Sequence, residues 1–350
     1  MDMTISLEQA LTLRSKGALM VDARSPEEYA EATIPGAVNV PILNNAERAE
    51  IGTLYKREGK LIARRRGVEI VAPKIPVLVE RVAEMRASET SLAVVFCWRG
   101  GLRSRAMAQF LDLAGIPARQ MAGGHKRFRQ HVLRFFSEAE WGRMIVLRGL
   151  TGVGKTRILN NLAAIGHEVI DLEGLASHRG SAFGNLDLPA QPTQKMFEAL
   201  LWDRLQRIPP TSHVLVEGES RWIGRLQLPV RVYQAMQQET CIWLNASLAT
   251  RVNNLLEDYS ALTEAKERFV EPIQALKERL GAQAVEELLS YLDRGAWDDL
   301  VRELMTRYYD PLYRHKQPKE CIEVNVESLG AGLDAVLDAV TQVLAPVSER

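Results

Sequence analysis

The segment "GLTGVGKT" at residues 149–156 restricts the fold more strongly than any other part of the chain. It matches the pattern G-x4-G-K-[ST], it follows an apolar run at 143–149, and it precedes a helical pattern at 155–166. A strand, a glycine-rich loop and a helix in this order form a phosphate-binding loop in parallel α/β domains. The sequence therefore predicts such a domain, with an anion site at the end of a strand. The alternative is a glycine-rich turn that only packs.

The glycines of this segment let the backbone curl so that successive N–H groups point at phosphate oxygens, and the helix N-terminus adds its dipole. Lys155 is expected to reach the terminal phosphate, and Thr156 is a candidate ligand for Mg²⁺. The motif does not decide whether ATP or another phosphate compound binds. The candidate phosphate-binding residues are Gly149, Gly152, Gly154, Lys155 and Thr156.

Two further segments are predicted to lie near this loop. Glu217 and Glu219 end a predicted strand at 212–220, where an acid can position Mg²⁺ through water or cap a helix. The glycine-rich segment 171–184 follows another strand, and its composition suits close approach to an anionic or nucleotide ligand. An ordinary connection is the competing interpretation. The candidate substrate residues of this segment are Asp171, His178, Arg179 and Ser181.

The alternation of short apolar runs and helical patterns predicts an α/β domain of the P-loop NTPase type over residues 141–350. A mostly helical insertion is expected at about 248–318, between the last two strands. The five predicted strands are 143–149, 167–174, 212–220, 240–246 and 321–327.

Residues 1–140 show the same alternation and are expected to form a separate parallel-sheet domain. One helix start is well marked, because Ser25 is a good N-cap, Pro26 suits the first helical position and Glu28 can complete a capping box. The domain joint is expected near 138–142. The other predicted elements are strands at 18–24 and 91–97, short strands near 33–42 and 116–121, and helices at 44–58, 74–87, 98–114 and 126–137.

The segment "VVFCWRGGLRSR" at 94–105 places Cys97 between an apolar strand and a loop rich in glycine and arginine. Loop N–H groups, a helix N-terminus and nearby guanidinium groups favour a thiolate. The same surroundings can bind an anionic donor, so Cys97 is a candidate nucleophile that carries a transferred atom covalently. A buried structural thiol is the alternative, and it suits Cys241 and Cys321. The candidate donor-binding residues are Arg99, Gly100, Gly101 and Arg103.

Lys and Arg balance Asp and Glu at 44 each, but residues 97–134 hold eight basic residues and one acid. Such a stretch can attract a polyanion, although a solvated basic surface is the simpler explanation. The mixture of basic and aromatic residues at 125–136 suits phosphate contacts and base stacking. Further candidates for nucleic-acid contacts are the arginines at 64–66 and the segment 307–316.

The chain shows neither a signal-peptide pattern nor an apolar run long enough to cross a membrane. Its three cysteines have no paired spacing, which argues against a disulfide framework or a zinc site. A cytoplasmic protein that does not interact with membranes is therefore expected.

The first domain resembles a rhodanese domain. The resemblance rests on "VDARSPEEYAEATIPGAVNVPI", "VVFCWRGGLRSRAMAQFL" and "MAGGHKRF", and it puts Cys97 at the nucleophile position. From Cys97 to Arg103 the loop is Cys-x5-Arg, which is one residue longer than in common single-domain rhodaneses and similar to rhodanese-fold phosphatases. A wider loop is expected to hold a donor bulkier than thiosulfate.

With "GLTGVGKT", "DLEGLASHRGSAFG" and "VEGESRWIG" after these motifs, the chain resembles the bacterial tRNA 2-selenouridine synthase family nearly end to end. The resemblance implies conversion of wobble 2-thiouridine in tRNA to 2-selenouridine, with selenophosphate as the selenium donor. It also implies S-geranylation of the thiouridine from geranyl diphosphate, and no tightly bound cofactor. Our hypothesis assigns geranylation to the phosphate loop and selenium transfer to Cys97, as an S-selanylcysteine intermediate.

Three other functions compete with this interpretation. The first is a rhodanese-type sulfurtransferase fused to an ATP-dependent, kinase-like domain. The second is a regulatory binding module with an inactive rhodanese fold, which the intact Cys97 and the complete phosphate-loop motif disfavour. The third is a phosphatase, which requires an acid to protonate the leaving oxygen, and the loop itself offers none.

Overall fold

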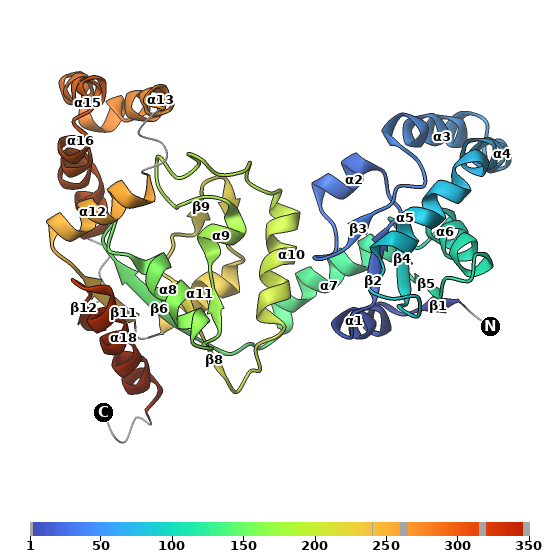
Figure 1. The fold of residues 1–350 in the computed structure, drawn as a ribbon, viewed down its shortest axis with the longest axis horizontal. Coiled ribbons are helices and arrows are strands. Elements are labelled where there is room, and N and C mark those ends of the chain that lie inside the picture. Colours follow the sequence, from blue (N-terminus) through green and yellow to red (C-terminus); the bar gives the residue numbers. More distant parts are fainter. Residues whose placement is uncertain (1–2, 240, 260–264, 315–319, 346–350) are drawn as a thin grey trace. The chain divides into compact units, whose positions relative to one another are not determined.

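The computed structural model describes residues 3–239, 241–259, 265–314 and 320–345 (Figure 1). The chain divides into two compact units. The first comprises Met1–Ala139 and Pro192–Asp203, and the second comprises Glu140–Gln191 and Arg204–Arg350. The sequence placed everything after residue 140 in the second domain, whereas the contacts group Pro192–Asp203 with the first unit. Trp202 explains this grouping, because its buried ring packs edge-on against Phe128 at 5.0 Å.

The first unit contains a five-stranded parallel sheet in the order β1-β5-β4-β2-β3. The four strands expected from the sequence are confirmed, while β1 is a two-residue strand without a recognisable pattern. The central strand β4 is buried along its whole length, which means that both faces of the sheet are covered. The strands are β1 (Thr4–Ile5), β2 (Leu19–Asp22), β3 (Val38–Asn39), β4 (Ala93–Phe96) and β5 (Ala118–Met121).

Several helices of this unit begin where the local sequence provides a capping residue. In α2 the predicted start is confirmed, since Pro26 is the first helical residue and the Glu28 carboxylate accepts a hydrogen bond from the Ser25 N–H at 3.2 Å. The helix α4 was not predicted, because three consecutive arginines and a glycine weaken its apolar periodicity. The helices are α1 (Leu7–Ser15), α2 (Pro26–Glu31), α3 (Asn45–Arg57), α4 (Lys60–Val71), α5 (Ile75–Met85), α6 (Leu102–Leu113), α7 (Gly124–Glu138) and α10 (Gln194–Leu205), with a 3-10 turn at Ala72–Lys74.

The second unit contains a parallel five-stranded sheet in the order β12-β11-β6-β8-β7. All five predicted strands are confirmed, and a short antiparallel hairpin of β9 and β10 was missed. The register places the free cysteines Cys241 and Cys321 side by side, although they are distant in sequence. The strands are β6 (Arg143–Gly149), β7 (Val169–Ile170), β8 (His213–Glu217), β9 (Trp222–Ile223), β10 (Leu226–Gln227), β11 (Cys241–Asn245) and β12 (Cys321–Asn325).

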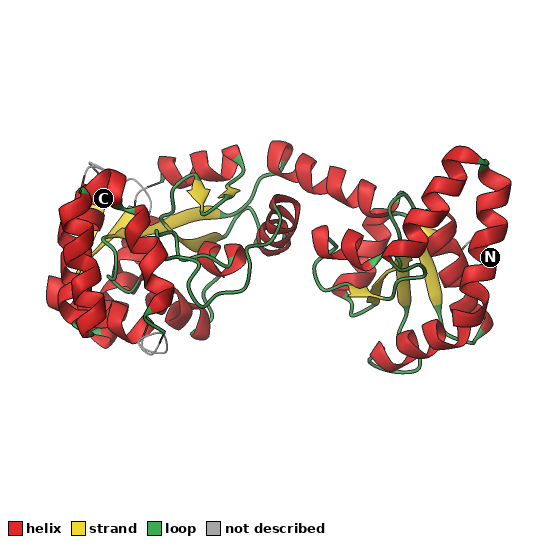
Figure 2. Ribbon diagram, turned by 90° about the horizontal axis from the view of Figure 1, so that it is seen from above, coloured by secondary structure: helices red, strands yellow, loops and turns green. Residues whose placement is uncertain are grey.

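Helices α8 and α18 share a core with this sheet. Leu159 and Leu162 of α8 and Val340 of α18 pack against strand residues such as Ile145 and Leu244. Figure 2 shows the strands of each unit surrounded by helices. No helix in the described ranges is long and apolar enough to cross a lipid bilayer. The helices outside the insertion are α8 (Lys155–Ala164), α9 (Leu172–Ala176), α11 (Val230–Gln238) and α18 (Leu329–Leu344).

The predicted insertion is helical in its described part, and its core also includes Phe183 and Leu186 from outside the insertion. Residues 260–264 and 315–319, which were included in the prediction, lie outside the described residues. Ile273, Leu288 and Leu304 belong to this core. The helices are α12 (Leu248–Asp258), α13 (Glu267–Ala275), α14 (Lys277–Leu280), α15 (Ala282–Arg294), α16 (Trp297–Leu304) and α17 (Asp310–Arg314), with a π-helical turn at Met305–Tyr309.

Candidate functional sites

Cys97 follows the central strand β4, and the loop it begins leads into α6. Its side chain is only 3% exposed. The Gly101 N–H donates to the Cys97 sulfur at 3.2 Å, and the Ser104 hydroxyl lies 3.2 Å from the same atom. The loop thus directs one backbone N–H and one hydroxyl group at the sulfur. The role of Cys97 as a thiolate nucleophile stays a prediction.

Close packing of two glycines shapes this cradle. Gly100 has a φ of +63°, and a Cβ there would lie 2.7 Å from the Met121 carbonyl oxygen. Gly124 has a φ of +56°, and a Cβ there would lie 2.0 Å from the Cys97 carbonyl oxygen. The neighbouring N–H of His125 donates to that same oxygen at 2.8 Å. The segment that starts α7 therefore rests directly on the cysteine loop.

The two arginines predicted to bind the donor have different environments. Arg103 forms two hydrogen bonds with Glu28; burial would lower the pKa of the guanidinium, but the hydrogen bond and the charge of Glu28 raise it overall. Burial would raise the pKa of Glu28, but the hydrogen bond and the charge of Arg103 lower it overall. Arg99 is exposed and has no partner in the described part of the chain. Arg99 is thus the cation that is free to meet an anion.

The phosphate loop lies at the mouth of a cavity of about 520 Å³ in the second unit. Gly152 and Gly154, at φ +78° and +88°, line it together with Lys155 and Thr156. The Lys155 ammonium donates to the Gly149 carbonyl at 3.3 Å. Gly149 itself does not line the cavity, because it packs against β11, where a Cβ would lie 2.6 Å from the Leu244 carbonyl oxygen. Four of the five predicted phosphate residues therefore face one cavity.

The segment 171–184 contributes to the same cavity only in part. Asp171, Arg179 and Ser181 line it, together with Glu219 from the loop after β8. His178 is not among the lining residues: its Nδ1 accepts from the Gly180 N–H at 3.2 Å, so the imidazole holds the loop rather than facing a ligand. Asp171 also caps α9 by accepting from the Gly174 N–H at 2.7 Å.

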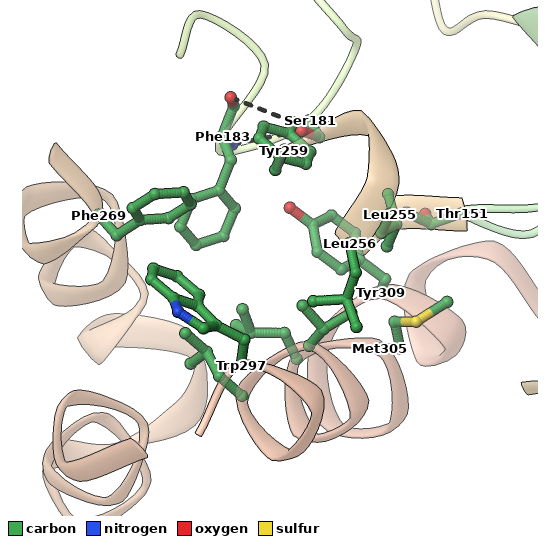
Figure 3. A pocket seen from close by; sticks show the side chains of 13 residues that line it. Thr151, Ser181, Phe183, Leu255, Leu256, Tyr259, Phe269, Trp297, Met305 and Tyr309 are labelled. Atoms are coloured by element: carbon green, nitrogen blue, oxygen red, sulfur yellow. Dashed lines mark hydrogen bonds between the residues drawn. The ribbon is translucent and has the colours of Figure 1, made fainter. Parts of the chain in front are cut away.

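An apolar pocket adjoins the phosphate cavity (Figure 3). It has a volume of about 70 Å³, room for roughly five water molecules. In Figure 3, Thr151 lies on one side of the pocket, and Phe269 and Trp297 lie on the other. The residues that line both spaces are Thr151, Ser181, Leu255 and Tyr259.

Residues 142–342 match the family described as tRNA 2-selenouridine synthase AAA domain, and residues 6–131 match the rhodanese-like domain. The chain is 32% identical to the tRNA 2-selenouridine synthase of Nitrosomonas europaea, over 84% of this chain and 88% of that protein. The chain belongs to the tRNA 2-selenouridine synthase family. Its identity to the synthase of Bdellovibrio bacteriovorus is 33%, over 88% of this chain and 91% of that one. For Cupriavidus necator the identity is 36%, with coverages of 86% and 89%.

This family membership confirms the resemblance that the motifs indicated, and the two matches confirm the predicted domain types. The three relatives share the name tRNA 2-selenouridine synthase. The competing interpretation, a sulfurtransferase fused to a kinase-like domain, finds no support in these relatives.

The second unit also places two carboxyl groups, those of Glu173 and Glu217, close together. Glu217, 1% exposed, accepts the Glu173 N–H at 2.6 Å through one carboxyl oxygen, and its other oxygen has no partner in the described residues. Burial, followed by the charge of Glu219, raises the pKa of Glu173 to about 8. Burial and the charge of Glu173 also raise the pKa of Glu217 well above its usual value. Glu173, which lines the cavity, is therefore substantially protonated at neutral pH.

The basic segments predicted to contact nucleic acid are only partly available. The expectation of base stacking at 125–136 is wrong for Phe128 and Phe136, which are 1% and 7% exposed and belong to the core. Among the arginines at 64–66, Arg66 pairs with Glu50 and Glu69, whereas the other two are exposed. In the segment 307–316, Arg307 pairs with Glu287 and Glu303, and residues 315 and 316 lie outside the described residues.

Several residues that shape the two candidate sites carry no local sequence signal. Ser104 and Gln120 brace the cysteine loop, since the Gln120 amide donates to the Gly100 carbonyl at 2.8 Å. From the insertion, the Asn254 amide donates to the Gly152 carbonyl at 2.9 Å, and Arg251 donates to the Thr151 carbonyl at 3.2 Å. Only the tertiary fold brings α12 to the phosphate loop, so no pattern in the sequence could have revealed these contacts.

The role of Gly124 can be measured against a matched glycine. Gly115→Ala introduces a side chain at φ +78° into open space and should cost about 1–2 kcal/mol of unfolding free energy. Gly124→Ala should cost roughly 3 kcal/mol or more, because its Cβ also collides with the Cys97 carbonyl. Urea denaturation followed by circular dichroism measures both. Equal losses would show that the contact with the cysteine loop contributes nothing.

The raised pKa of Glu173 predicts a dependence of stability on pH. The folded state holds a proton that the unfolded chain releases near the ordinary value of 4.5, so unfolding becomes easier as pH rises from about 5 to 8. Glu173→Gln should remove this contribution, so its melting temperature should rise relative to that of the unmodified chain as pH increases from 5 to 9. Glu286→Gln, on an exposed face of α15, is the control and should give a constant offset. A constant offset for Glu173→Gln as well would contradict the assignment.

Proposed function

We propose that this chain converts 2-thiouridine at the wobble position of tRNA to 2-selenouridine in two steps. The second unit transfers a geranyl group from geranyl diphosphate to the uridine sulfur, and the first unit replaces the geranylated sulfur with selenium from selenophosphate. Family membership supports the overall conversion. The observation that carries the first step is the apolar pocket that shares four lining residues with the phosphate cavity.

In the first step the diphosphate binds at the phosphate loop and the isoprenoid chain enters the apolar pocket. The uridine sulfur attacks the allylic carbon, the C–O bond breaks, and diphosphate leaves with the electron pair, while the base loses its N3 proton. Lys155 and the N–H groups of the loop stabilise the charge that develops on the leaving group. Protonation of Glu173 in the cavity wall lets a diphosphate approach with less repulsion.

Mg²⁺ fits this arrangement as a companion of the diphosphate. Thr156 and Glu219 both line the cavity, and they offer oxygen ligands of the kind that Mg²⁺ prefers. The described residues contain no cluster of three or more His, Cys, Asp or Glu side chains suited to a metal. The ion would therefore arrive with the diphosphate, whose charge it neutralises when bound.

The shape of the pocket favours an isoprenoid diphosphate over ATP. Phe183, Phe269 and Trp297 supply aromatic walls. The ring centroids of Phe183 and Phe269 lie 6.2 Å apart, and those of Phe269 and Trp297 lie 5.2 Å apart. An adenine or a ribose would leave its polar edge groups without hydrogen-bond partners against such walls, which costs binding free energy. A hydrocarbon chain gains from the same burial.

In the second step the Cys97 thiolate, held by the Gly101 N–H and Ser104, attacks the selenium of selenophosphate. An S–Se bond forms, the Se–P bond breaks, and phosphorus leaves with the electron pair as phosphite. The terminal selenium of this S-selanylcysteine then attacks C2 of the base and displaces geranylthiolate. A thiol reductant cleaves the S–Se bond, and a second thiol restores Cys97 as a disulfide of the reductant forms. Arg99 is exposed and unpaired in the described residues, so it is free to hold the donor anion.

Substitution of one residue in each unit separates the two steps. Cys97→Ala should still form S-geranyl-2-thiouridine but no 2-selenouridine, because only the second step uses the thiolate. Lys155→Ala should reduce geranylation by about 100-fold, as loss of one oxyanion donor does, and pre-geranylated tRNA should restore its selenation. Mass spectrometry of nucleosides, in reactions without ATP, measures both products. Cys321→Ala is the matched cysteine control.

Two outcomes would contradict this assignment. If Cys97→Ala lost geranylation while Lys155→Ala kept it, the steps would belong to the opposite units. Phosphorus NMR of the same reactions tests the intermediate: release of phosphate without phosphite would mean that selenium attacks the base directly, and that Cys97 never carries it.

The apolar pocket should determine the length of the isoprenoid chain. Trp297 lies across the pocket from Thr151, so Trp297→Ala should deepen the pocket (Figure 3). We expect the ratio of kcat/KM for farnesyl diphosphate to kcat/KM for geranyl diphosphate to rise at least about tenfold. Trp222→Ala is the matched control, because Trp222 is 55% exposed and does not line the pocket. An unchanged ratio in Trp297→Ala would exclude the pocket as the chain site.

A further inference from the structure

The first unit contains an apolar groove beside the cysteine loop. It has a volume of about 520 Å³, and its lining comes mainly from α3, α4 and α6. Its walls are almost entirely hydrocarbon, although the groove is open to solvent. The residues that give it this character include Tyr55, Ala63, Val68, Val71, Leu102 and Phe110.

Three of these side chains are unusually exposed for their type. Val68 is 67% exposed, Tyr55 is 59% exposed and Leu102 is 48% exposed. A contiguous apolar surface of this kind marks a binding site more often than a solvent-facing surface. Neither a thiolate nor a small anionic donor requires an apolar wall, so the chemistry of Cys97 and selenophosphate leaves this groove unexplained.

The groove reaches the turn that holds the nucleophile. Leu102 and Arg103 line it, and they follow Gly101, whose N–H donates to the Cys97 sulfur at 3.2 Å. A ligand in the groove is therefore held next to the loop where sulfur and selenium are exchanged. The position of the groove therefore favours a part of the reacting substrate as its ligand, rather than a separate partner molecule.

The rim of the groove is basic. Lys60, Arg64 and Arg105 line it, and in the described part of the chain these three exposed side chains form no ion pairs. Such a rim complements the phosphate backbone of an RNA that carries an apolar group. Two copies of the groove facing each other would instead bring like charges together, which disfavours a second copy of this chain as the occupant.

We propose that this groove binds the geranyl substituent of S-geranyl-2-thiouridine in tRNA during selenium transfer, while the rim contacts the neighbouring phosphates. This inference rests on the proposed two-step function, since it requires a geranylated base as the substrate of the first unit. The apolar chain anchors the base so that C2 lies at the cysteine loop. The same groove then holds the chain of the departing geranylthiol.

Two substitutions on α4 test the groove. Both replace an apolar side chain of similar exposure with Asn, but only one of the two side chains lines the groove. Val68→Asn removes an apolar wall, whereas Leu61→Asn changes a side chain that is 63% exposed but does not line the groove. The full-length chain is supplied with selenophosphate and tRNA that already carries S-geranyl-2-thiouridine. We expect the KM for this tRNA to rise about tenfold in Val68→Asn, with kcat within about twofold. Leu61→Asn and the apolar Val68→Leu should resemble the unmodified chain.

Each other result has a definite meaning. Equal KM values for Val68→Asn and Leu61→Asn would contradict binding of the geranyl group in the groove and leave the proposed function intact. An unmodified chain that does not convert the geranylated tRNA would overturn the proposed function and the occupant of the groove together. A change in the sedimentation of Val68→Asn would assign the groove to contacts between copies of the chain and overturn the proposal. Formation of S-geranyl-2-thiouridine from geranyl diphosphate should be unchanged in all three variants, and its loss would show general damage instead of a groove effect.

Discussion

The constraint on which both sites depend is the turn from a central parallel strand into a helix, with backbone N–H groups directed at one point. β4 leads into α6 and β6 leads into α8, and in each case a glycine-containing loop closes the connection. In the first unit the Gly101 N–H donates to the Cys97 sulfur, and in the second the glycine-rich loop lines a cavity. We propose that the same backbone arrangement holds a thiolate in one unit and a diphosphate in the other.

Neither loop is held in place by its own residues alone. The cysteine loop rests on the glycine pair that starts α7, where Gly124 leaves no space for a Cβ. The phosphate loop is held by Asn254 and Arg251 of the insertion, and Arg251 is fixed by a buried ion pair with Asp310 at 2.8 Å. Losing one partner of such a pair costs about 3–5 kcal/mol. The insertion is consequently part of the phosphate site.

The sequence was sufficient to predict what depends on local pattern. It predicted nine of the strands and the positions of both loops, because strand–loop–helix order and glycine spacing are local properties, while the role of Cys97 as nucleophile stays a prediction. It could not predict that His178 braces a loop or that Phe128 belongs to the core, because burial is a property of the tertiary fold. The apolar pocket was also invisible, since its walls combine Phe183 with residues of α12, α13 and α16.

The charge distribution around the phosphate loop follows from the same packing. Four acidic residues lie near the site proposed for a diphosphate: Asp171, Glu173, Glu217 and Glu219. They would repel the ligand if all four were ionised. Burial reduces this repulsion, because it raises the pKa values of Glu173 and Glu217. The charge of Lys155 opposes this effect by lowering the pKa of Glu173. The adjoining pocket is lined mainly by apolar and aromatic side chains, so the isoprenoid chain that we propose for it would be selected by shape and hydrocarbon contact.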